Sequence, residues 1–74
     1  MPHVTIQHFP KPLTAGQQAR LVERLTAAVQ EAFEVDESAV SIALTPVPPE
    51  DWDSEVYQPA IAAHRGELAK APGY

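Results

Sequence analysis

The chain has 74 residues, 45% of them hydrophobic and 20% charged, a composition typical of one small globular domain over residues 1–74 and not of a disordered segment. Ten acidic residues against five basic ones give a net charge of −5, and the basic residues are scattered, which argues against a nucleic acid partner. There is no cysteine for a disulfide or a thiolate metal site, and no apolar run approaches the roughly 18 residues of a membrane span, so we expect a cytoplasmic protein with no membrane partner.

Two patterns predict a strand followed by a long helix in the first half of the chain. Apolar and polar side chains alternate over residues 2–9, which is the period of a strand with two different faces. Thr14 and Gln17 have the spacing of a capping box, in which each side chain pairs with the backbone of the other residue. Apolar residues then recur every three or four positions, so we expect an amphipathic helix over residues 15–33.

A second alternating segment, residues 40–45, completes a βαβ unit, for which parallel strands and a right-handed crossover are favoured. Residues 51–70 have a helical pattern that Pro59 should interrupt, either as a kink or in the first turn of a new helix. The predicted fold class is therefore α/β (α+β), a βαβ unit with a C-terminal helical segment. Two parallel strands alone do not make a viable sheet, and a chain this short buries only about 60% of its unfolded surface, so we expect a homo-oligomer.

Pro2 is the residue that most clearly points to chemistry. The three histidines lack metal-ligand spacing, there is no glycine-rich phosphate loop or nucleophile elbow, and the acids at positions 34, 36 and 37 are typical of a solvated loop. Removal of Met1, which is expected before a small residue, leaves Pro2 with a free secondary amine. Desolvation at the start of a strand lowers the pKa of that amine toward neutrality, where a base is suited to moving a proton between oxygen and carbon.

Five short stretches, in their order along the chain, carry a resemblance to a known family. They are Pro2-His3-Val4-Thr5-Ile6, Phe9-Pro10, Ser41-Ile42-Ala43-Leu44, Pro49-Glu50-Asp51-Trp52 and Lys70-Ala71-Pro72-Gly73-Tyr74. Together they resemble the tautomerase superfamily, closest to the small bacterial tautomerases with phenylpyruvate-type enol activity, relatives of 4-oxalocrotonate tautomerase. The resemblance implies a tautomerase/MIF-like fold completed by oligomerisation, and an isomerase that interconverts keto and enol groups without a cofactor. It also implies a dimer in preference to a hexamer, because the long C-terminal segment is similar to that of the dimeric relatives.

The resemblance implies roles for four residues. Pro2 corresponds to the N-terminal general base of the family. Trp52 falls where the family has an aromatic residue that lines the pocket, and an ordinary core tryptophan is the alternative interpretation. Lys11 lies within one position of an arginine that holds a substrate carboxylate, and a solvated loop lysine is the alternative there. Ser41 replaces a strand arginine that polarises the substrate carbonyl, so it offers one hydrogen bond in place of a cation.

The substitution at Ser41 affects the expected substrate. A monoacid enol with an apolar tail, such as phenylenolpyruvate, suits a single cation and Trp52 better than a dicarboxylate does. Two other functions stay open: hydratase or dehalogenase chemistry on unsaturated acids, with protonated Pro2 as the acid, and a catalytically silent oligomeric binding module. A two-strand unit is too small to enclose a substrate, so a pocket walled by Pro2 and Trp52 also needs a neighbouring subunit.

Overall fold

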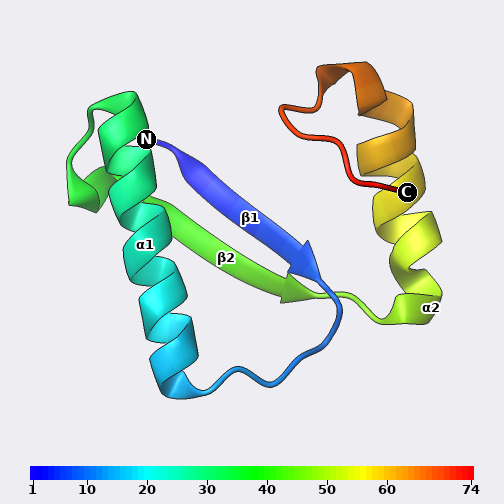
Figure 1. The fold of residues 1–74 in the computed structure, drawn as a ribbon, viewed down its shortest axis with the longest axis horizontal. Coiled ribbons are helices and arrows are strands. Elements are labelled where there is room, and N and C mark those ends of the chain that lie inside the picture. Colours follow the sequence, from blue (N-terminus) through cyan, green and yellow to red (C-terminus); the bar gives the residue numbers. More distant parts are fainter.

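The computed structural model describes residues 1–74, and it consists of a βαβ unit followed by a helical arm (Figure 1). Strand β1 (His3–His8) leads through helix α1 (Ala15–Phe33) and a 3₁₀ turn (Glu37–Ala39) to strand β2 (Ser41–Pro46). The two strands are parallel, and their register pairs the first residue of β1 with the first of β2 and continues in step to the last. The predicted α+β class and the parallel βαβ unit are therefore confirmed.

Helix α1 begins and ends where its sequence signals place it. The Gln17 N–H donates to Thr14 Oγ1 at 3.1 Å, and the Thr14 N–H donates to Gln17 Oε1 at 2.9 Å, so both halves of the capping box are formed. The helix ends at Glu34, which adopts the left-handed conformation (φ 53°) that reverses the chain direction. The expected helix over residues 15–33 is confirmed at both ends.

Helix α1 covers only one face of the sheet. Along β1 the side chains alternate between exposed and half-buried, and Ile6 and Leu44 line one cavity together with Leu21 of α1. The opposite face has no covering element (Figure 1). Val47 and Val56, at 3% and 5% exposure, are the only well-buried side chains, and they lie after β2 and in the arm. The apolar core of a single chain is therefore small.

The arm is one continuous helical segment that changes its winding twice. It begins as α2 (Pro49–Trp52), widens into a π-helix (Asp53–Ile61) and tightens into a 3₁₀ helix (Ala62–Glu67). The expected interruption at Pro59 is wrong, because Pro59 lies inside the π-helical stretch. The irregular residue is His64 (φ −127°, ψ 24°), so the change in geometry comes only after the wide turns end. None of the helices combines the length and the apolar character that crossing a bilayer requires.

Candidate active site

The structure places the four predicted site residues in two pairs at opposite ends of the sheet. Pro2 and Ser41 are neighbours at the amino end of the strands, where the Ser41 N–H donates to the Pro2 carbonyl oxygen at 3.3 Å. Trp52 contacts Phe9, just beyond the carboxyl end of β1. Phe9 follows Pro2 by seven residues, about 23 Å of extended chain at roughly 3.3 Å per residue. Within one chain Trp52 therefore does not reach Pro2.

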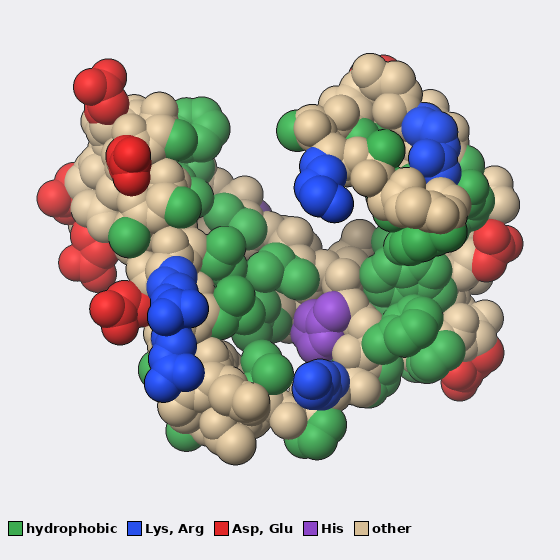
Figure 2. All heavy atoms as spheres, viewed as in Figure 1, with side chains coloured by type: hydrophobic (Ala, Val, Ile, Leu, Met, Phe, Trp, Pro, Cys, Tyr) green, Lys and Arg blue, Asp and Glu red, His purple; other side chains and the backbone are tan.

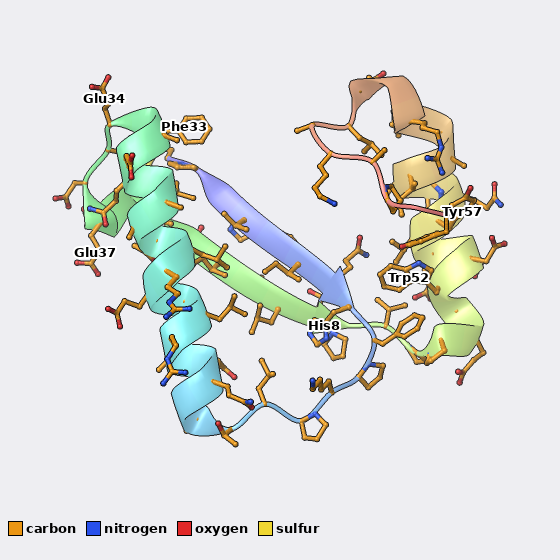
Figure 3. All side chains as sticks on the ribbon, viewed as in Figure 1. His8, Phe33, Glu34, Glu37, Trp52 and Tyr57 are labelled. Atoms are coloured by element: carbon orange, nitrogen blue, oxygen red, sulfur yellow. The ribbon has the colours of Figure 1, made fainter.

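Trp52 is a half-buried wall residue at the junction of sheet and arm. Its ring meets the Phe9 ring edge to face, with centroids 5.0 Å apart and planes at 86°, the arrangement that aromatic quadrupoles favour. The two rings line an open cavity of about 670 Å³ together with Gln7, His8 and Tyr74. Figure 3 shows Trp52 on the arm and His8 at the end of the sheet, with Tyr57 further along the arm. This position differs from that of a tryptophan enclosed in a core.

Lys11 lies at the same end of the sheet, on the connection from β1 to α1. It lines a smaller cavity of about 250 Å³ in which all the other residues but His8 are apolar. His8 and Phe9 belong to both this cavity and the one at Trp52, so the cation and the aromatic wall flank the same two residues. Figure 2 shows basic, imidazole and apolar side chains gathered over this end of the sheet. The carboxyl end therefore combines a positive charge with an apolar wall.

Pro2 is half-buried, whereas Met1 before it is 97% exposed. Nothing packs on Met1, so its removal would cost the fold no buried contact. With Met1 attached the Pro2 nitrogen is an amide and is not basic. Once Met1 is removed, the Pro2 nitrogen becomes a secondary amine at the amino end of the strands, on the residue next to Ser41.

The sequence did not single out His3, which the structure places against Ser41. Its Nδ1 lies 2.6 Å from Ser41 Oγ, and its Nε2 lies 3.2 Å from Thr5 Oγ1. All three side chains are exposed on the face that α1 leaves uncovered. The alternation along β1 places His3 and Thr5 on one face, but only the observed register brings Ser41 opposite His3.

The acidic cluster after α1 has a structural role. Asp36 accepts hydrogen bonds from the Ser38 hydroxyl at 2.6 Å and from the Ser38 N–H at 3.1 Å, and so caps the 3₁₀ turn. These hydrogen bonds, the side-chain one first, lower the pKa of the Asp36 carboxyl below its ordinary value. The Asp36 carboxyl is therefore explained as the cap of the 3₁₀ turn. No three His, Cys, Asp or Glu side chains of the chain lie together in a way that could hold a metal ion.

Comparison with known proteins identifies the family of the chain. Residues 2–56 match the model of the family described as "Tautomerase enzyme". The chain is 42% identical over its full length to "Tautomerase PptA" of Cronobacter sakazakii and 38% identical to the protein of that name from Pectobacterium atrosepticum, and covers 97% of each. It is 35% identical to "Probable tautomerase" of Xylella fastidiosa, of which it covers 89%. The chain therefore belongs to the tautomerase family and is an isomerase of the tautomerase type.

Proposed function

We propose that this tautomerase ketonises monocarboxylic enols with an apolar tail, such as phenylenolpyruvate, and uses Pro2 as the general base after Met1 is removed. The observation that carries the proposal is the position of Pro2. Pro2 is half-buried at the amino end of the strands, next to Ser41. Met1, the residue whose amide bond blocks the Pro2 nitrogen, is 97% exposed. Partial burial disfavours the ammonium form of the amine, which keeps it available as a base.

The reaction needs one base that takes a proton and then returns it. The Pro2 amine takes the hydroxyl proton of the enol, and the electron pair of that O–H bond forms the carbonyl. The electron pair of the C=C bond then takes the proton back from the Pro2 ammonium at the adjacent carbon. The amine ends as it began, so atoms and charge balance without an external oxidant or reductant.

The chemistry of the carboxyl end supports the choice of substrate. Lys11 supplies one positive charge, which suits one carboxylate, and Phe9 with Trp52 supplies an apolar wall for a tail. Because this end lies far from Pro2 in the same chain, a complete site requires a second copy. A twofold dimer in which strands of the two copies run antiparallel places the carboxyl end of one beside the amino end of the other. Such a dimer would hold two equivalent sites.

The first experiment compares the Met-free protein with Pro2→Ala. Intact mass establishes that Met1 is absent from both preparations, and the decay of the enol absorbance of phenylenolpyruvate gives the rate. We expect kcat/KM to fall by about 100-fold or more in Pro2→Ala, the usual contribution of a positioned general base. Pro10→Ala, at an exposed proline beyond β1, is the matched control and should retain the wild-type rate. Equal rates for Pro2→Ala and wild type would refute the role of Pro2.

A second experiment tests whether the site is shared between subunits. Pro2→Ala and Trp52→Ala are each expected to be impaired alone. After the two are unfolded together and refolded at equal amounts, half of the dimers are mixed and each mixed dimer has one intact site, so about a quarter of wild-type activity should return. Mixing Pro2→Ala with the double variant leaves no intact site and is the control. Failure to recover activity, with mixed dimers detected by native mass spectrometry, would contradict a shared site.

A further inference from the structure

The uncovered face of the sheet carries a polar group at the end where Pro2 lies. Six side chains from the two strands lie on this face: His3, Thr5, Gln7, Ser41, Ala43 and Thr45. His3 is the only ionisable side chain among them, so no lysine, arginine or carboxylate belongs to this face. A substrate oxygen that reaches this face beside Pro2 therefore meets hydroxyl and imidazole groups of the same chain.

The hydrogen bonds of His3 connect Thr5 to Ser41 through the ring. Ser41 Oγ lies 2.6 Å from Nδ1, and Thr5 Oγ1 lies 3.2 Å from Nε2. A neutral imidazole donates from one nitrogen and accepts at the other. The two tautomers of His3 therefore give two possible arrangements of donors and acceptors from Thr5 to Ser41. If Thr5 donates to Nε2 and Nδ1–H donates to Ser41, the Ser41 hydroxyl hydrogen is free. In the reverse direction the Ser41 hydroxyl donates its hydrogen to Nδ1, so that hydrogen is not available to a substrate.

Only the first direction provides a donor for the substrate. When Pro2 removes the enol proton, negative charge develops on the oxygen, and a fixed donor aimed at that oxygen lowers the barrier. The Ser41 N–H donates to the Pro2 carbonyl oxygen at 3.3 Å, so the backbone of Ser41 is held next to the residue that carries the base. A hydroxyl whose oxygen accepts from Nδ1–H is also polarised toward donation.

We propose that His3 is a positioning residue of the tautomerase site, which aims the hydroxyl hydrogen of Ser41 at the developing substrate oxyanion. Nδ1–H of His3 donates to Ser41 Oγ, and Thr5 holds this tautomer by donating to Nε2. The inference rests on the proposed function, since it assigns the oxyanion donor for the reaction in which Pro2 is the base. It also predicts an effect of Thr5, whose hydroxyl group pairs only with His3.

The variants are chosen to separate tautomer control from mere packing. Ser41→Ala and His3→Leu should each lower kcat about tenfold with little change in KM, because the hydrogen bond strengthens in the transition state. The double variant should fall no further than either single one. His3→Asn places an amide N–H where Nδ1–H was and should restore most of the rate, whereas His3→Gln should not. If His3→Asn and His3→Leu lower kcat equally, the positioning role is wrong.

Thr5→Val supplies a test at a residue whose hydroxyl group pairs only with His3. It removes the donor to Nε2, so we expect kcat to fall about threefold to tenfold. Thr45→Val is the matched control on the same face at the opposite end of the sheet, and it should leave kcat unchanged. An unchanged kcat in Thr5→Val would overturn the assignment of the Thr5 hydroxyl as the group that holds the tautomer.

Long-range ¹H–¹⁵N spectra of the histidine rings read the tautomer directly, with His3 assigned by its loss in His3→Leu. We expect the Nδ1–H tautomer in wild type and a shift toward Nε2–H in Thr5→Val. A dominant Nε2–H tautomer in wild type would overturn the inference. If Pro2→Ala abolishes activity while the His3 and Thr5 variants keep it, this inference fails and the proposed function stands. If Pro2→Ala is fully active, the proposed function fails, whatever the ring spectra show.

Discussion

Replacement of Val56 with alanine tests whether the helical arm is anchored to the rest of the chain. Val56 is 5% exposed, and Val47 at the end of β2 is 3% exposed, so these two side chains are the buried part of the junction. The substitution removes two buried carbon groups at about 0.8 kcal/mol each, and the residual cavity raises the loss to about 2 kcal/mol. The better helix propensity of alanine returns a few tenths of a kcal/mol. We therefore expect the free energy of unfolding to fall by about 1.5 kcal/mol or slightly more.

Urea unfolding at one fixed protein concentration measures this loss. Trp52 is the only tryptophan of the chain and lies in the arm, so its fluorescence reports the junction while far-UV circular dichroism reports the helices. With a denaturant slope of about 1 kcal/mol per molar, typical of a small domain, the midpoint should move down by about 1.5 M. Val22→Ala is the matched control, because Val22 on α1 is 37% exposed and its loss should cost less than about 0.5 kcal/mol. Equal midpoints for the two variants would refute the buried anchor.

Three further predictions concern the ends of the elements. Thr14→Ala removes the N-cap of α1 and should lower the free energy of unfolding by about 1 kcal/mol in the same urea assay. The pKa of Asp36 is lowered by its hydrogen bonds from Ser38, so the stability advantage over Asp36→Asn should be present at neutral pH and disappear as the pH falls through that lowered pKa, as measured by midpoints across pH. Arg65→Met removes the donor that holds the Tyr74 backbone oxygen at 2.5 Å, so hydrogen exchange of the last residues should become faster.

The βαβ unit was predictable because its signals are local and agree with one another. The alternation in β1 and the capping box at Thr14 depend only on neighbouring residues, and the structure places α1 at Ala15–Phe33, where those signals put it. The parallel direction of the strands then follows from the length of the crossover. Because these local signals agree with one another, the βαβ unit can be predicted from the sequence.

The arm was less predictable because the rule for proline assumes α-helical hydrogen bonds. Pro59 lacks a donor and was expected to break the helix, but it lies in π-helical turns that continue to Ile61. The sequence carries no signature that distinguishes a π-helical stretch from an α-helical one. The irregular backbone appears instead at His64, where no breaker residue stands.

The role of His3 depends on register, which the sequence fixes only loosely. Parity along each strand places His3 on one face, but a shift of the pairing by two residues would keep that parity and move Ser41 away from His3. The distance between Pro2 and Trp52, in contrast, follows from the topology. Parallel strands share one amino end and one carboxyl end, so a residue before β1 and a residue after β2 lie at opposite ends of any such sheet.

The small core and the proposed division of the site between two copies have the same origin in this two-stranded sheet. Each strand has one unpaired edge, one face lacks a cover, and only Val47 and Val56 are well buried, so a single copy leaves much apolar and hydrogen-bonding surface open. Antiparallel pairing with a second copy would close an edge, and the same twofold operation would bring Trp52 of the partner subunit toward Pro2. Stability and activity would then depend on one association equilibrium. Substitutions that weaken the pairing should reduce both together, while substitutions at Pro2 should reduce activity alone.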